Sequence, residues 1–202
     1  MKGISYFFPA IGSKFNSCHD NLGQFCSGSN EFLVSLESKL PTISSDKEQS
    51  LYVFNKLGFT NKPTIVNNLE NEIKEGDILF YRGVKSEDIV DQFKNGDYIL
   101  GKGAFGRGIY TATGEIGLTG AMTYGKNEKN IIKGALDKSA KIANYDNLRK
   151  ERVEKLREYP NLNDLGRSNE GLAAALLGYD AIEIPGSNTL LILNRSKVKV
   201  EK

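Results

Sequence analysis

Residues 101–125 have the sequence GKGAFGRGIYTATGEIGLTGAMTYG, in which eight of 25 positions are glycine. The whole chain has 21 glycines in 202 residues, so this segment holds more than a third of them. Because glycine costs conformational entropy on folding, such a density indicates places where the backbone bends sharply or approaches another group closely. We therefore look for the functional site around this segment.

The glycine spacing is similar to two phosphate-binding loops but fits neither. Residues 101–106 match G-x-G-x-x-G, yet Ile109, Tyr110 and Thr111 favour a strand, whereas a dinucleotide-binding turn opens a helix. The G-x-x-x-x-G-K-[ST] loop needs a lysine and a hydroxyl that this segment lacks at those positions. Neither type of loop is therefore expected here.

Apolar spacing predicts helices first and short strands later. The helical period at 30–40 ends at Pro41, and the one at 45–58 ends at Gly58. This order indicates an α+β fold instead of a regular βαβ alternation. We expect a helical lobe over 29–75 and a β core over 76–202. Within the core, strands are predicted at 77–83, 97–101, 130–136, 141–145, 180–184, 189–194 and 197–200, and helices at 86–96, 145–159 and 169–179.

The composition excludes several classes of function. Of the residues, 39% are hydrophobic and 26% charged, and the formal net charge is only +2. Such a balance does not favour bulk attraction to DNA or to a membrane surface, and no apolar run approaches the roughly 18 residues of a membrane span. A single histidine and two cysteines exclude a zinc finger and a disulfide framework. We therefore expect neither a metal nor a membrane partner.

The first 28 residues are rich in Ser, Asn and Gly, which predicts a flexible N-terminal arm. Pro9 interrupts a short apolar run, so a secretion signal is not expected. Cytoplasmic residence follows as the default, with Cys18 and Cys26 as free thiols. His19 has no neighbours at metal-ligand spacing and is expected to be structural or solvent-exposed.

Several segments together resemble the arginine-type (Arg, Ser-x-Ser, Glu) branch of the ADP-ribosyltransferase superfamily. Arg82 follows an aromatic residue at the end of a predicted strand and precedes a glycine, as in the first motif of that branch. The stretch 103–113, GAFGRGIYTAT, is similar to the donor loop, and its Thr-Ala-Thr stands where the branch has Ser-x-Ser. The ending, GYDAI and then LILNRSKV, resembles the closing strands of phage- and prophage-borne members, so the resemblance covers about 77–200.

The resemblance implies a split β-sandwich of two small facing sheets around an NAD⁺ cleft. In that cleft Arg82 would anchor the donor through its rigid fork of N–H groups. Gly83 would hold the carboxamide, Tyr110 would stack on the nicotinamide, and Thr111 or Thr113 would orient Arg82 or the ribose. Alternatively, Tyr110 belongs to the core and Arg82 pairs with a carboxylate. Further NAD⁺ contacts are expected from Tyr81, Phe105, Gly108, Tyr124 and Asn188.

The sequence departs from the family at its glutamate. The reaction breaks the bond between ribose and nicotinamide, and a carboxylate should stabilise the positive charge that develops on the ribose. Residues 186–190 offer no glutamate at the family's position. Glu170, Glu183 and Glu115 remain as catalytic candidates, with helix capping, a solvent-facing strand position and a solvated loop as their respective alternatives.

The expected function is transfer of ADP-ribose from NAD⁺ to a macromolecular acceptor, protein rather than nucleic acid, with hydrolysis of NAD⁺ as a side activity. The string HDNLGQFCSG at 19–28 resembles linkers of phage head-morphogenesis proteins. A phage effector acting in the cytoplasm of a bacterial host, or associated with the virion, is the expected setting. Two alternatives are an NAD⁺-binding or partner-docking module without activity and a structural phage protein.

Overall fold

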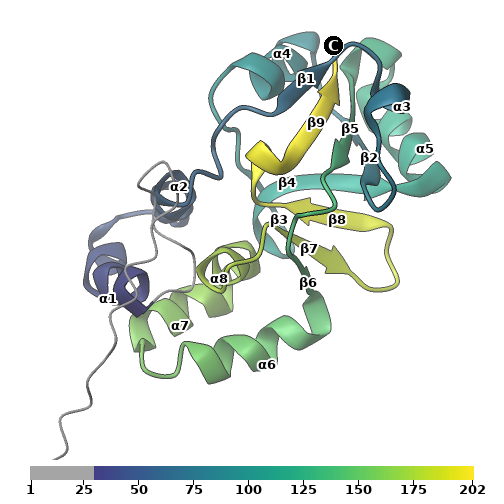
Figure 1. The fold of residues 1–202 in the computed structure, drawn as a ribbon. Coiled ribbons are helices and arrows are strands. Elements are labelled where there is room, and N and C mark those ends of the chain that lie inside the picture. The colour runs from purple at the N-terminus through teal and green to yellow at the C-terminus, as the bar shows by residue number, and fades with distance from the viewer. Residues whose placement is uncertain (1–29) are drawn as a thin grey trace, which may run out of the picture.

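The computed structural model describes residues 30–202, which form helices packed around one large mixed sheet (Figure 1). The strands follow the order β1-β9-β5-β2-β4-β8-β7-β6, and β3 pairs with β4 beside this path. The predicted α+β class is therefore confirmed. The strands are β1 (Thr64–Val66), β2 (Ile78–Gly83), β3 (Gly101–Gly103), β4 (Gly106–Thr113), β5 (Ile131–Leu136), β6 (Ile142–Asn144), β7 (Ala181–Ile184), β8 (Thr189–Ile192) and β9 (Val198–Glu201).

The sheet is continuous but consists of two halves that meet between β2 and β4. Only two residue pairs join these strands, Phe80 with Thr113 and Tyr81 with Ala112. By contrast, β2 pairs with β5 over its whole length, from Ile78 to Gly83. Strands β5 and β9 of one half run in a different direction from β4 and β8 of the other (Figure 1). The junction is thus the place where the sheet opens.

The helices cover the two halves unequally. Helix α5 packs on β2 and β4, while α8 packs on β4 and β7. Helices α1, α2, α6 and α7 gather around α8 to the left of the sheet and below it (Figure 1). The helices are α1 (Asn30–Lys39), α2 (Asp46–Lys56), α3 (Leu69–Glu72), α4 (Glu87–Asn95), α5 (Gly114–Gly125), α6 (Tyr145–Lys155), α7 (Pro160–Ser168) and α8 (Glu170–Leu176), with short 3₁₀ turns at Leu40–Thr42, Glu128–Asn130 and Arg195–Lys197.

One hydrophobic core joins the helical region to the sheet. Phe32 of α1 and Phe54 of α2 belong to the same buried cluster as Ile182 and Leu191 of the sheet. Helix α2 begins after Ser45, whose hydroxyl accepts the N–H of Glu48 and so caps the helix. Helices α1 and α2 also pack on α7 and α8, so the helical region combines segments from both ends of the described chain.

Several parts of the sequence prediction need correction. Residues 97–100 do not form a strand, and the strand of this region is the shorter β3. Pro160 starts α7 as well as following α6, because proline at the first helical position leaves no hydrogen bond unmade. Helix α5 was not predicted, since Gly114, Gly117 and Gly120 all disfavour a helix. Strand β1 and the short α3 were likewise not predicted.

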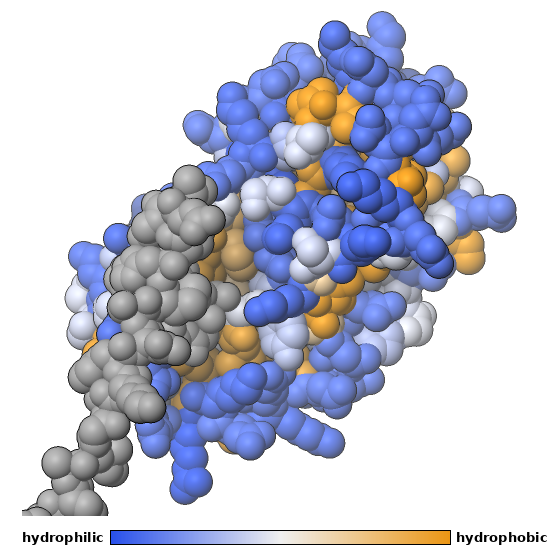
Figure 2. Space-filling model, viewed as in Figure 1, coloured by the Kyte–Doolittle hydropathy of each residue, from blue (hydrophilic) through white to orange (hydrophobic). Residues whose placement is uncertain are grey.

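Most of the charged residues of helix α6 are exposed. Its apolar Leu148 is fully buried, and the surface around α6 is hydrophilic in the space-filling view (Figure 2).

None of the helices within residues 30–202 is long and apolar enough to cross a membrane. In the same range, no three His, Cys, Asp or Glu side chains are grouped to hold a metal ion. The predicted arm with Cys18, His19 and Cys26 lies outside the described residues.

Candidate functional site

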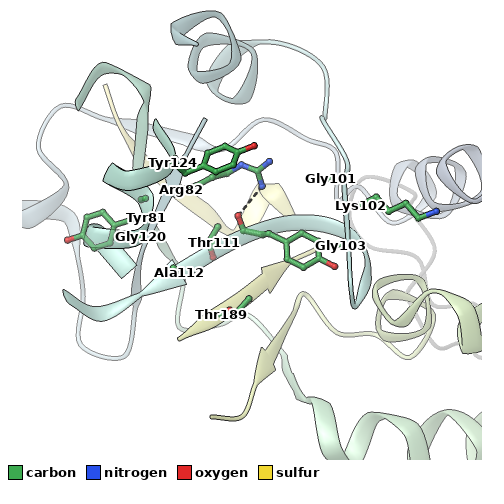
Figure 3. Close-up of a pocket in the computed structure, with 13 residues that line it drawn as sticks. Tyr81, Arg82, Gly101, Lys102, Gly103, Thr111, Ala112, Gly120, Tyr124 and Thr189 are labelled. Atoms are coloured by element: carbon green, nitrogen blue, oxygen red, sulfur yellow. Dashed lines mark hydrogen bonds between the residues drawn. The ribbon is translucent and has the colours of Figure 1, made fainter. Parts of the chain in front are cut away.

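A cavity of about 500 Å³ opens where β2 and β4 separate (Figure 3). Its walls come from the end of β2, from β3 and β4, from the middle of α5 and from the first residue of β8. Of the residues predicted to bind NAD⁺ or to act on it, six line this cavity. They are Tyr81, Arg82, Gly83, Tyr110, Thr111 and Tyr124.

The opening exists because a side chain replaces a backbone hydrogen bond. On one side of β2, the N–H of Val84 donates to the carbonyl of Asn130. Because backbone groups of successive residues point to alternate sides of a strand, those of Gly83 point to the other side, toward β4. Tyr81 pairs with Ala112, so the same register would place Tyr110 opposite Gly83. The pairing between β2 and β4 does not extend that far. The carbonyl of Tyr110 instead accepts from Nη1 of Arg82 at 3.0 Å (Figure 3).

Arg82 is a partly buried cation with no acidic partner. Among residues 30–202, no carboxylate lies within ion-pair distance of its guanidinium, so the alternative of a structural ion pair is not what forms. Burial lowers the pKa of Arg82 from its ordinary value, yet a guanidinium remains charged at neutral pH. A guanidinium withdrawn from water without a counter-ion is costly. This arrangement therefore favours a ligand that brings negative charge.

Tyr110 is held by the β3–β4 hairpin. Its hydroxyl accepts the N–H of Phe105 at 3.0 Å and donates to the carbonyl of Gly106 at 2.9 Å. Burial raises the pKa of Tyr110 above its ordinary value, so the hydroxyl keeps its proton. A Cβ on Gly103 would overlap the Tyr110 ring, with Cε1 only 2.8 Å away. Glycine at 103 is therefore what lets the hairpin close over the ring.

Glycines of both β2 and α5 allow the helix to pack closely against the sheet. A Cβ on Gly83 would overlap the carbonyl oxygen of Ala121 and lie 2.8 Å from the nitrogen of Gly125. A Cβ on Gly117 would lie 2.7 Å from the carbonyl carbon of Ala112. This approach brings the helix to the cavity, where Tyr124 contributes a side chain that is 59% exposed.

The two threonines are placed differently from the prediction. Thr111 is buried and lines the cavity, but its hydroxyl donates to the carbonyl of Leu190 at 2.8 Å and so ties β4 to β8. Thr113 lies against the carbonyl of Asn188, with 3.5 Å between the oxygens. Neither hydroxyl bonds Arg82, because the Tyr110 carbonyl occupies that role. The threonines therefore hold strands together.

Four predicted residues lie outside the cavity. Thr113 and Asn188 line a neighbouring hollow of about 200 Å³. The Phe105 ring packs edge-on against Tyr145, with 4.9 Å between centroids. A Cβ on Gly108 would lie 2.5 Å from Cδ1 of Leu191, so this glycine allows side-chain packing across β4 and β8.

None of the three candidate carboxylates lines the cavity. Glu170 is buried at the start of α8, where Oε1 lies 3.5 Å from Nε of Arg149 and Oε2 has no hydrogen-bond partner among residues 30–202. Glu183 stands opposite Leu190 and lines the neighbouring hollow, which shares Thr189 with the cavity. Glu115 is exposed in the first turn of α5. Within residues 30–202 the cavity wall contains no Asp or Glu.

Sequence reasoning missed a second cation in the cavity wall. Lys102 lies on β3 between two glycines that also line the cavity. The available sequence signal for Lys102 was a basic residue between two glycines just before a turn. The Lys102 side chain extends away from Arg82, and its ammonium lies 3.6 Å from Oδ2 of Asp46 (Figure 3). The other lining residues that were not predicted are Gly101, Gly103, Ala112, Gly120, Ala121 and Thr189.

Comparison with known proteins gives no family for this chain. No protein-family model, no curated protein and no solved structure matches it. Function therefore has to be inferred from the residues of the cavity.

Proposed function

We propose that the cavity binds NAD⁺ and that the protein transfers its ADP-ribose to a macromolecular acceptor. The observation that carries this proposal is Arg82, a partly buried guanidinium in the cavity wall that lacks a carboxylate partner within residues 30–202. The phosphates of NAD⁺ supply the negative charge that such a group attracts, and the planar fork of N–H donors suits phosphate oxygens.

The rest of the wall is compatible with the other parts of NAD⁺. The backbone N–H and C=O of Gly83 face the opening and complement a carboxamide, which has one acceptor and one donor. Tyr110 and Tyr124 offer aromatic surface to the cationic nicotinamide ring. A volume of about 500 Å³ lies within the usual range of sites for small molecules and cofactors.

The topology supports an ADP-ribosyltransferase-like split β-sandwich as the proposed fold. A split sheet requires two halves with an opening at their junction. Here each half has four strands, and two residue pairs join the halves. Chemical transfer would break the ribose–nicotinamide bond through a positively charged transition state. Because no described carboxylate lines the cavity, that charge lacks its usual stabilisation, and we expect slow transfer.

A second candidate function is an NAD⁺-binding module that transfers nothing. The lack of Asp and Glu in the cavity wall, among residues 30–202, favours this alternative. NAD⁺ would then remain intact, and the protein would act by docking a partner. Both candidates require the same cavity and differ only in whether the ribose–nicotinamide bond breaks.

Incubation with NAD⁺ labelled on its adenylate and with a bacterial lysate distinguishes the candidates. The proposed transferase labels macromolecules, and Arg82→Met abolishes the label. Arg157→Met is the matched control, because Arg157 is exposed and outside the cavity. Saturable NAD⁺ binding with no label transferred would support the module instead. Neither binding nor label in the unaltered protein would overturn both candidates.

A further inference from the structure

Gly120, in the middle of α5, is a glycine that the packing of the protein does not require. Every other glycine within residues 30–202 either adopts a positive φ or lies where an added Cβ would come within 3.1 Å of a neighbouring atom. At Gly120 the φ is not positive, and an added Cβ would meet nothing within 4 Å. Because glycine destabilises the interior of a helix relative to alanine, this position favours a role other than packing.

The open space over Gly120 belongs to the cavity. From α5, the cavity wall receives Gly120, Ala121 and Tyr124. Positions 120 and 124 are one helical turn apart, so a side chain at 120 would point to the same side of the helix as Tyr124. Tyr124 lies beside Arg82 and interacts with it electrostatically (Figure 3). A side chain at 120 would therefore occupy space that a ligand of Arg82 can use.

Gly120 also lies next to the backbone that complements a carboxamide. A Cβ on Gly83 would overlap the carbonyl oxygen of Ala121, the residue that follows Gly120. The N–H and C=O of Gly83 thus face the opening directly beside this part of α5. Because a carboxamide is bonded directly to its ring, a ring held at Gly83 lies close to the α5 wall. Gly120 is the residue of that wall that has no side chain and open space above it.

We propose that Gly120 makes the cavity specific for a flat ring that carries a carboxamide, by leaving room for this ring against the backbone of α5 beside Tyr124. A larger residue at 120 would fill that room and keep the ring off the helix. A ligand that lacks the ring would not meet the added side chain. This inference rests on the proposed function, because the ring in question is the nicotinamide of NAD⁺.

Calorimetric titration with NAD⁺ and with ADP-ribose tests this role, because NAD⁺ is ADP-ribose joined to nicotinamide. In Gly120→Leu we expect the Kd for NAD⁺ to rise roughly tenfold or more, since pocket size discriminates strongly between ligands. The Kd for ADP-ribose should stay unchanged in the same variant. Gly120→Ala adds a single methyl group and should raise the Kd for NAD⁺ by a smaller factor.

Thr119→Leu is the matched control. Thr119 is exposed on the same helix and is not part of the cavity wall. Leucine has a higher helix propensity than either glycine or threonine, so both leucine variants should melt at or above the temperature of the unaltered protein. Thr119→Leu should change neither Kd. A preserved melting temperature together with weaker NAD⁺ binding in Gly120→Leu is a result that damage to the fold does not produce.

The outcomes separate this inference from the proposed function. Unchanged NAD⁺ affinity in Gly120→Leu, or an equal loss of affinity for ADP-ribose, would overturn the role of Gly120 and leave NAD⁺ binding in place. Binding of free nicotinamide that is lost in Gly120→Leu, without any binding of NAD⁺ to the unaltered protein, would overturn the proposed function and leave the ring site in place. An unaltered protein that binds neither NAD⁺ nor nicotinamide would overturn both.

Discussion

Arg82 donates to the backbone carbonyl of Tyr110 at the point where the ladder between β2 and β4 ends. The bond holds the two halves of the sheet at a fixed distance while leaving the backbone of Gly83 without a strand partner on that side. One side chain thus both shapes the opening and supplies its charge. Binding and local structure are coupled at this position.

The glycines of the cavity predict opposite effects of the same substitution. Gly83→Ala would force α5 away from β2, because the new Cβ overlaps Ala121, and we expect a loss of about 2–3 kcal/mol in the free energy of unfolding. Gly120→Ala meets nothing within 4 Å and should gain up to about 1 kcal/mol from helix propensity. Urea unfolding measures both, and a Gly83→Ala protein as stable as Gly120→Ala would contradict the packing described.

Removal of the Tyr110 hydroxyl should loosen the hairpin. In Tyr110→Phe the N–H of Phe105 loses its acceptor and the carbonyl of Gly106 loses its donor. We expect a loss of about 1–2 kcal/mol in stability and faster amide exchange at Phe105. Hydrogen exchange followed by NMR measures this effect residue by residue. Unchanged protection at Phe105 would show that the hydroxyl does not hold the turn.

Arg195 is a second buried guanidinium, and it holds several backbone segments together. It is 2% exposed and donates to the backbone carbonyls of Thr60, Asn61, Phe93, Gly96 and Asp97. Arg195→Met leaves these carbonyls without their donor, so we expect a loss of about 3 kcal/mol or more in stability. Arg157→Met serves as the exposed control in the same urea titration. Equal free energies of unfolding for the two variants would contradict the role given to the Arg195 hydrogen bonds.

Asp77 should make the stability depend on acid. Burial opposes ionisation of its carboxyl, but the Lys199 ammonium at 2.7 Å and the N–H groups of Lys74 and Lys138 outweigh burial, so its pKa lies below the ordinary value. Because the pKa is lower in the folded state, the stabilisation is complete above the unfolded-state pKa of about 3.9. It disappears as the pH falls through the folded-state pKa.

Unfolding free energies between pH 7 and pH 2 test this dependence in the unaltered protein and in Asp77→Asn. The variant should lose about 3 kcal/mol at pH 7, since the substitution removes the nearer of the two carboxylates beside Lys199 and leaves Asp137 at 4.0 Å. Its unfolding free energy should also fall less steeply at acid pH. An equally steep fall in both proteins would exclude Asp77 as the source of the acid dependence.

Local sequence signals were sufficient to predict Arg82 and its strand. A short apolar run that ends in arginine and glycine is visible without any knowledge of distant residues, and β2 forms as predicted. The alternation around Glu183 likewise predicts its exposed position. Helix α5 was missed because propensity disfavours glycine, while contacts with Gly83 and Ala112 make glycine the residue that fits.

The remaining parts of the site depend on residues that the sequence does not bring together. The pairing of Lys102 with Asp46 requires the packing of α2 beside the hairpin, which no periodicity reveals. Thr111 or Thr113 was expected to hydrogen-bond Arg82 or the ribose, but the strand register gives the Thr111 hydroxyl the carbonyl of Leu190. Register is set by the whole sheet, so a local motif cannot determine which group a side chain bonds.

Calorimetric titration of NAD⁺ into the unaltered protein and into Arg82→Met tests the central claim most directly. We predict saturable one-site binding to the unaltered protein and to the control Arg157→Met, and a loss of more than about tenfold in affinity for Arg82→Met, because the guanidinium is the anchor for the phosphates. No heat of binding with the unaltered protein, or equal affinity in Arg82→Met, would contradict the claim that this cavity recognises NAD⁺ through Arg82.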